Sequence, residues 1–304
     1  MDNEQVARFP GAEAPVREYR LDASGVGIAV HEWGDEDAPP IFLAHGGFDF
    51  ARTYDVFAPK LAAAGWRVVS WDQRGHGDSD HTALYSWEAD VRDAIEVFES
   101  VTSEPAPAIG HSKGGGLMMY LADAAPHRFT HLVNLDGMPF RSPVPDVAEH
   151  ERRRMLASDL AGWLDHRRST ATSVRKPGTL DDLARRRRRM NPRLPFEWLR
   201  YLAAVGARHD DDGWRWKLDP SMRMGGFGPW RPEWMAMQIP GLPMPFLGIL
   251  GLEPEMMGWN TKPDDIRHLI PATGQLVGLD GVGHFVHIEQ PDQVLGLILD
   301  FLGS

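Results

Sequence analysis

Short apolar runs bounded by Gly, Pro or Asp recur in the first 140 residues of the chain and again near its end. Runs of this length between turn residues are typical of buried strands. Two candidates, at residues 16–21 and 26–32, come first and fit an antiparallel start. The other predicted strands are residues 41–45, 67–71, 106–110, 131–135, 245–250 and 275–279.

Amphipathic stretches of helical length separate most of these strands. They are residues 52–64, 86–101, 113–124, 263–269 and 292–302. Strands that alternate with helices form βαβ units, and the strands of such units lie parallel in one sheet. We therefore expect an α/β fold with a mainly parallel sheet.

One long region breaks this alternation. Residues 141–237 contain no buried-strand run, are rich in Arg, Trp and Met, and show several helical patterns. We predict a helical insertion after the strand that ends at Leu135. Its basic run at residues 185–189 would suit a nucleic acid, but Asp181 and Asp182 lie beside it. A solvated helix face is the better interpretation of such a run in an acidic protein.

Composition and charge narrow the picture further. The 304 residues suit one large domain or a core with an insertion, and the formal charge of −11 argues against nucleic acid as the main partner. The chain has no cysteine, which removes disulfides, zinc–thiolate sites and cysteine nucleophiles. The polar, acidic N-terminus lacks signal-peptide features, and no apolar run has the length of a membrane span. We expect a cytoplasmic protein without a membrane partner, and its oligomeric state stays open.

The sequence gives no sign of a metal or a cofactor. The 13 histidines are scattered without metal-ligand spacing, apart from His284 and His287. The glycines of residues 110–116 lack the G-x-x-x-x-G-K-[ST] order of a phosphate-binding loop. We therefore expect neither a bound metal nor a cofactor.

A nucleophile candidate lies at Ser112, in the G-x-S-x-G pattern of residues 110–114. An apolar strand leads into this stretch and a helical pattern leads out, so the turn between them must be tight. Glycines on both sides have no Cβ to collide with the neighbouring backbone, and Ser112 is then held in a strained conformation. Its hydroxyl would project near the start of the following helix, where the free N–H of Lys113 favours developing negative charge.

A serine hydroxyl needs a base and an oxyanion site. His284, in GVGHFVHIEQP after the last predicted strand, is the candidate base; His287 is the near alternative, with a satisfied structural role as its expected function. The N–H of Gly47, after the strand at residues 41–45, is the predicted oxyanion donor beside the Lys113 N–H. Phe48 N–H is the alternative donor. We expect the side chain of Lys113 to be exposed.

The order of these motifs resembles the α/β-hydrolase superfamily with a cap domain. The resemblance rests on HGG, DQRGHGDSD, GHSKGG and GVGHFVHIEQP, and runs over residues 41–138 and from residue 240 to the end. It implies an eight-stranded, mostly parallel sheet with helices on both faces and a helical cap. The core would comprise residues 1–140 and 238–304, and the cap residues 141–237. The family uses the loop at residues 72–80 mainly as structure, so Arg74 and His76 carry no expected chemistry.

The resemblance also implies a catalytic triad, in the order nucleophile, acid, histidine, and here the chain departs from the common pattern. Many members carry an aspartate just after the strand predicted at residues 245–250, where this chain has only Glu253 and Glu255. Other members place the acid after the preceding strand, which offers Asp136. We favour Asp136, then Glu253, then Glu255. Each would accept Nδ1–H of His284 and fix its tautomer.

The sequence therefore predicts a cofactor-independent serine hydrolase. Its substrate would be a small molecule with an apolar portion and a carboxylic ester, lactone or thioester bond. Serine in place of aspartate as nucleophile argues against haloalkane dehalogenase and epoxide hydrolase chemistry. Carbon–carbon hydrolysis, acyl transfer, cofactor-free haloperoxidase or perhydrolase activity, and a ligand receptor with an idle triad remain as alternatives.

Overall fold

The core of the molecule is one eight-stranded sheet. A computed structural model describes residues 8–138, 149–222 and 237–303. The strand order is β1-β2-β4-β3-β5-β6-β9-β10, in which β2 pairs antiparallel with β1 and β4 and all the other pairs are parallel. The predicted fold class and strands are confirmed. Their bounds are Arg17–Asp22, Gly27–Trp33, Pro40–Ala44, Arg67–Trp71, Ala106–His111, Phe129–Leu135, Phe246–Gly251 and Gly274–Leu279.

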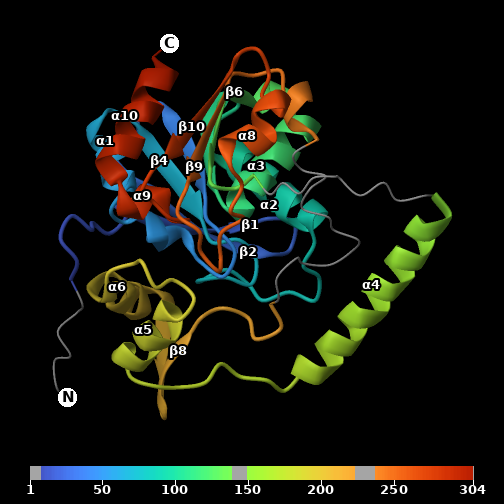
Figure 1. The fold of residues 1–304 in the computed structure, drawn as a ribbon. Helices are drawn as coiled ribbons and strands as arrows, with labels where there is room; N and C mark the ends of the chain where they lie inside the picture. Colours follow the sequence, from blue (N-terminus) through green and yellow to red (C-terminus); the bar gives the residue numbers. More distant parts are fainter. Residues whose placement is uncertain (1–7, 139–148, 223–236, 304) are drawn as a thin grey trace.

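Helices cover both faces of this sheet (Figure 1). On one face lie α1 (Ala58–Ala63) and α10 (Pro291–Leu302), and on the other lie α2 (Trp87–Val101), α3 (Lys113–Ala124) and α8 (Pro263–Ile266). Two separate apolar cores result, one containing Leu61 and Ile298 and the other Phe98, Leu117 and Ile266. Strands covered on both faces are mainly apolar, which is why the central strands form nearly continuous apolar runs in the sequence.

Two predicted helices are shorter in the structure than in the sequence pattern. The stretch at residues 52–64 divides into the 3-10 helix η1 (Ala51–Tyr54) and α1. Pro59 explains the break, because proline has no N–H and its ring clashes with the carbonyl four residues earlier. The stretch at residues 263–269 divides likewise into α8 and the 3-10 helix η4 (Arg267–Leu269). Two short elements remain, η2 (Pro126–Arg128) and α9 (Val286–Glu289).

Between β6 and β9 the chain leaves the sheet and forms what we call the insertion. It contains α4 (Glu149–Thr170), α5 (Leu180–Arg188), α6 (Phe196–Gly206), β7 (Ala207–Asp210) and β8 (Gly213–Trp216), before η3 (Ile239–Gly241) leads back to β9. Figure 1 shows α5, α6 and β8 grouped at one end of the core, whereas α4 extends away from it. The first predicted domain boundary, at residue 140, lies outside the described residues.

The hairpin formed by β7 and β8 was not expected in a purely helical insertion. Its strands are four residues each, carry Arg and Asp, and lack the apolar run that marks a buried strand. Gly213 closes the turn between them with a φ of 126°. In the part of the chain that the structure describes, no helix combines the length and the apolar character needed to cross a bilayer.

Side-chain caps fix the starts of α2 and α5, which carry residues discussed below. The Ser86 hydroxyl accepts the Ala89 N–H at the start of α2. A reciprocal capping box between Thr179 and Asp182 begins α5. The expectation of a solvated arginine face holds for Arg185, which is exposed and pairs with Asp182. It is wrong for Arg187, whose side chain is 11% exposed because it turns inward to Asp49 in the core.

Candidate active site

Ser112 forms the turn between β5 and α3. Its φ of 52° and ψ of −119° lie in a region that L-residues rarely adopt. A Cβ at Gly110 would overlap the Gly114 carbonyl, and one at Gly114 would overlap the Ala44 carbonyl on β3. These two glycines therefore allow the close approach of backbone that the sharp turn needs, and the strained turn expected at Ser112 is present.

Asp136 and His284, which are 148 residues apart in the sequence, lie in direct contact. His284 Nδ1 lies 2.6 Å from Asp136 Oδ2, and Gly251 N–H donates to Asp136 Oδ1 at 3.2 Å. Both side chains are buried. Asp136 follows β6 with a φ of 47°, so a second residue at this edge of the sheet has a left-handed backbone. The carboxylate fixes Nδ1 as the protonated nitrogen and leaves Nε2 as a proton acceptor.

The two alternative acids lie elsewhere. Glu255 Oε2 accepts the backbone N–H of His284 at 2.8 Å, so this carboxylate holds the His284 loop rather than the ring. Burial raises the pKa of Glu255, and the hydrogen bond from His284 acts in the opposite direction. Glu253 has an exposed side chain, and its backbone N–H donates to Val282 O. Of the three predicted acids, the structure places Asp136 on the imidazole.

Two further histidines pack behind His284. His111 Nε2 lies 2.9 Å from the His284 carbonyl, and the ring centroids of these two residues are 4.7 Å apart. His287 is fully buried against His111, Tyr54 and Phe57. Neither ring nitrogen of His287 has a hydrogen-bond partner among the described residues, so its expected satisfied role is wrong. Burial lowers the pKa of His287 to about 3.

Gly47 and Lys113, the residues of the predicted oxyanion donors, lie side by side. Residues 46–49 form a turn closed by Asp49 N–H to Gly46 O at 3.3 Å. A Cβ on Gly47 would lie 3.7 Å from Lys113 Cβ, which places this turn against the start of α3. Gly47 N–H has no acceptor among the described residues, and the first N–H groups of a helix have no acceptor within that helix. The alternative donor, Phe48 N–H, instead points to His76 Nε2 at 3.3 Å.

The loop at residues 72–80 supports this turn from the core side. Gln73 N–H donates to His45 Nε2 at 3.0 Å, and Gln73 Nε2 donates to His45 O at 2.6 Å. His76 Nδ1 lies 3.0 Å from Arg74 O, which leaves its Nε2 free to accept the Phe48 N–H. Burial lowers the pKa of both His45 and His76, so both rings are neutral supports. The structural role expected for His76 fits these contacts.

The side chain of Lys113 is not exposed as expected. Its Nζ donates to Gln73 Oε1 at 2.7 Å and to Asp90 Oδ2 at 2.6 Å. The same atom lies 5.7 Å from the centre of the Trp87 ring, and the side chain is 24% exposed. Trp87 and Asp90 are three residues apart and therefore share a face of α2. An aromatic residue and a carboxylate on one face of the predicted helix could have indicated a cation as their partner.

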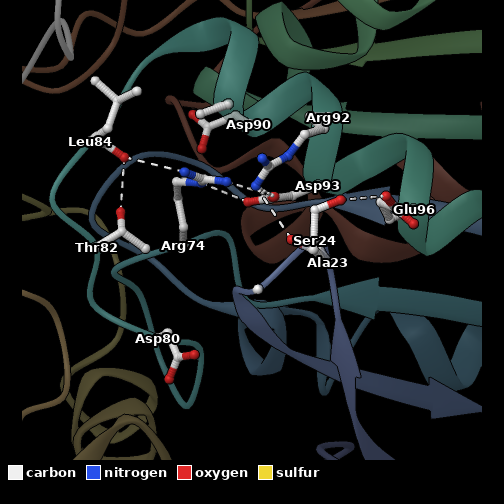
Figure 2. A network of polar contacts seen from close by, with 12 residues as sticks. Ala23, Ser24, Arg74, Asp80, Thr82, Leu84, Asp90, Arg92, Asp93 and Glu96 are labelled. Carbon is white, nitrogen blue, oxygen red and sulfur yellow. Dashed lines mark hydrogen bonds and ion pairs between the residues drawn. The ribbon is translucent and has the colours of Figure 1, made fainter.

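Arg74 ties the same loop to α2 (Figure 2). Its Nε and Nη2 each donate to a different Asp93 oxygen at 2.6 Å, and both side chains are buried. Asp90 and Asp93 thus hold two cations, Lys113 next to the candidate nucleophile and Arg74 in the supporting loop. A two-point guanidinium–carboxylate pair has fixed geometry, so the loop is held in one orientation.

Within residues 8–138, 149–222 and 237–303, no three His, Asp or Glu side chains are arranged to hold a metal ion. The chemistry visible at this edge of the sheet is that of proton transfer. An alcohol lies at a strained turn, an imidazole is held by a buried carboxylate, and the turn that contains Gly47 lies against the residue that follows the alcohol. This arrangement suits nucleophilic attack on a carbonyl group.

Comparison with known proteins adds to these observations. A family model described as "Alpha/beta hydrolase family" matches residues 41–297. Esterase YbfF of Escherichia coli is 26% identical over 278 residues, covering 87% of this chain and 93% of that protein. A serine hydrolase-like protein of Dictyostelium discoideum is 32% identical over 128 residues, covering 40% of this chain, which thus matches about a third (35%) of that protein. The solved thioesterase domain from the curacin biosynthetic pathway shares the fold, with a TM-score of 0.77 at 24% identity over 93% of this chain and 99% of its own.

Proposed function

Since this chain belongs to the alpha/beta hydrolase family, we propose that it is a serine hydrolase that cleaves a carboxylic ester, lactone or thioester. The substrate is a small molecule with an apolar portion, and the reaction passes through an acyl-enzyme. The observation that carries the proposal is the 2.6 Å contact between His284 Nδ1 and Asp136, at the same sheet edge as the strained Ser112.

In the first half-reaction, Ser112 Oγ attacks the carbonyl carbon while His284 Nε2 takes the hydroxyl proton. Asp136 accepts the Nδ1–H bond throughout and stabilises the imidazolium that forms. The N–H groups of Gly47 and Lys113 donate to the carbonyl oxygen as it becomes an oxyanion. One such donor typically contributes about 3 kcal/mol to stabilisation of the transition state. His284 then protonates the leaving group as the bond to it breaks.

In the second half-reaction, water attacks the acyl carbon and gives a proton to His284 Nε2. The tetrahedral intermediate collapses, Ser112 Oγ leaves and takes that proton back, and the carboxylic acid departs. We propose that the insertion acts as a cap that shields the acyl-enzyme and supplies apolar contacts to the substrate. Its contacts with Asp49, the last residue of the turn at residues 46–49 (the oxyanion turn), and with Asp55 support this role.

Covalent labelling with a fluorophosphonate, followed by mapping of the labelled residue, tests the nucleophile. We expect one label, on Ser112, and turnover of a p-nitrophenyl ester series. Ser112→Ala should lose label and at least about 10⁴-fold in kcat, since removal of a nucleophile leaves only residual catalysis. Ser100→Ala is the matched control, because Ser100 lies near the end of α2 and its hydroxyl donates to Val97 O in the same helix.

Turnover that survives in Ser112→Ala would reject this serine as the nucleophile. A folded wild type that binds esters without turnover and takes no label would favour the receptor alternative. Added hydrogen peroxide that yields a peracid would instead favour the perhydrolase activity of the same triad.

A further inference from the structure

Asp49 closes the oxyanion turn with a buried charge. Its side chain is 2% exposed, and neither carboxylate oxygen has a hydrogen bond of good geometry among the described residues. The charge that faces it is Arg187, whose Nη2 lies 3.1 Å from Asp49 Oδ2. A buried carboxylate without a cation would be strongly unfavourable, so this turn depends on a residue of the insertion.

Arg187 contacts two consecutive residues of that turn. Besides the Asp49 carboxylate, it reaches the Phe48 carbonyl, with Nη1 3.5 Å from Phe48 O. Its guanidinium also lies 5.7 Å from the centre of the Trp216 ring on β8, and that contact holds its plane in place. Helix α5 and strand β8 therefore aim one guanidinium at the loop that follows β3.

The turn needs such a restraint, because Phe48 has a φ of 61°. Glycine is the usual residue at the third position of a turn with this backbone, and a side chain there is strained. Two contacts oppose relaxation. On the core side His76 Nε2 accepts the Phe48 N–H, and on the insertion side Arg187 contacts the Phe48 carbonyl. If Phe48 relaxed, the Gly47–Phe48 peptide would reorient, and we expect the adjoining Gly47 N–H to move with it.

Docking of the insertion does not depend on Arg187. Tyr201 Oη donates to Asp55 Oδ2 at 2.5 Å, and Arg52 Nη2 donates to Tyr201 Oη at 3.2 Å. Phe50 also packs into the apolar cluster of α6. These contacts attach the insertion to η1 and its neighbours, and they leave Arg187 as the residue whose target is the oxyanion turn itself.

We propose that Arg187 is a positioning residue that fixes the Gly47–Phe48 turn in its oxyanion-binding conformation. Through this residue the insertion would raise the rate of the reaction in the core. The inference rests on the proposed function, because it assigns Arg187 to the oxyanion site of that reaction. It assigns a role to one arginine of the run at residues 185–189, in which Arg185, Arg188 and Arg189 are exposed.

The test compares Arg187→Met with Arg187→Lys, and with Arg188→Met as the matched control on the exposed side of α5. The readouts are kcat and KM for a p-nitrophenyl ester, the inhibition constant of a trifluoromethyl ketone that forms an oxyanion adduct, and thermal unfolding. For Arg187→Met we expect kcat to fall about 10²-fold with KM little changed, as for loss of an oxyanion donor. The inhibition constant should rise by a similar factor. Lysine should restore part of the loss, and Arg188→Met should match wild type.

A second variant separates positioning from stability. Arg187→Met combined with Asp49→Asn removes the unpaired buried charge, so we expect unfolding to return toward wild type while kcat stays low. If kcat recovers together with stability, or if Arg187→Met stays within threefold of wild type, the inference is overturned. A wild type that labels at Ser112 while the Arg187 variants behave normally overturns this inference alone. A wild type that neither labels nor turns over rejects the proposed function, and this inference with it.

Discussion

Asp136 is the residue on which the proposed triad depends at the level of single side chains. Asp136→Asn keeps the size of the side chain but favours the wrong tautomer of His284. We expect kcat to fall about 10⁴-fold with little change in KM. Glu253→Gln should match wild type, because that side chain is exposed. Glu255→Gln should have a smaller effect than Asp136→Asn, because Glu255 binds the backbone of His284. Steady-state ester kinetics on the three purified variants decide this.

The opposite ranking would count against the assignment. If either glutamine variant loses activity while Asp136→Asn keeps it, the acid lies after β9 rather than after β6.

His287 gives a prediction about stability rather than activity. Its ordinary pKa is about 6.5, and burial lowers it to about 3 in the folded chain. Between these values the unfolded chain binds a proton that the folded chain does not, so this residue makes stability fall as the pH falls from about 6.5 to about 3. The slope from one such group is up to about 1.4 kcal/mol per pH unit. His287→Leu should reduce the acid slope by that amount and be neutral or stabilising at pH 8, because it removes two unpaired nitrogens.

Urea unfolding at pH 8, 6 and 5 measures this effect. His127→Leu is the control, because that histidine is exposed in η2. Parallel pH dependence in wild type and His287→Leu would show that His287 does not resist protonation in the folded state.

The role of a single residue could be predicted from the sequence only where the residues that determine it are its neighbours in the chain. The turn at Ser112 was predictable because its glycines adjoin it. Asp136 and His284 were candidates because each follows a recognisable strand, but Glu253 follows one as well, so strand position alone did not choose the acid. For Lys113 the spacing of Trp87 and Asp90 on α2 was the one available signal, and it did not show which cation would bind there. The contacts of Arg187 were not predictable, because the loop after β3 supplies its partner. Nothing in a basic run shows which member turns inward.

At the level of elements, the space around a glycine differs between the turn at Ser112 and a surface helix. A Cβ on Gly110 at the end of β5 would overlap the Gly114 carbonyl, whereas one on Gly296 in α10 meets nothing within 4 Å. We expect Gly110→Ala to destabilise by about 1–3 kcal/mol, as overpacking does. Gly296→Ala should stabilise by about 0.5–1 kcal/mol, because alanine is the better helix former. Chemical denaturation of both variants measures this, and equal effects would contradict the packing described for the turn.

Apolar patterns in the sequence predicted some elements of the fold and missed others. Apolar runs identified the central strands of the main sheet, because both of their faces are buried. The edge strand β1 is polar and mostly exposed, so its pattern was weaker. The helix expected at residues 52–64 was interrupted by Pro59, and the β7–β8 hairpin was missed because short exposed strands have no apolar signature.

For the whole molecule, one cluster joins core and insertion. Phe50, which directly follows the oxyanion turn, packs with Trp198 and Leu202 of α6 and lies against Gly206. Phe50→Ala should lower the free energy of unfolding by about 3–5 kcal/mol, as for other buried phenylalanines. Because the cluster is shared, we expect calorimetry to show one transition that moves to lower temperature. Two separated transitions in the wild type would mean that the insertion unfolds on its own.

The alternation of strands and helices predicted the sheet and the place where the chain departs from it. How the insertion sits on the core could not be predicted, because that depends on pairs such as Tyr201–Asp55 that lie 146 residues apart. Such pairs leave no periodic trace in a single sequence.

Phe48, Ser112 and Asp136 all have a left-handed backbone, and they follow β3, β5 and β6, which are neighbours in the sheet. Glycine at any of the three would relax the chain by about 1–3 kcal/mol. A laboratory selection for thermal stability alone would therefore favour glycine at these positions and so remove side chains of the candidate active site. In a related protein that no longer needs the proposed activity, we expect substitutions at these three positions early. Glycine at them would indicate that the activity has been lost.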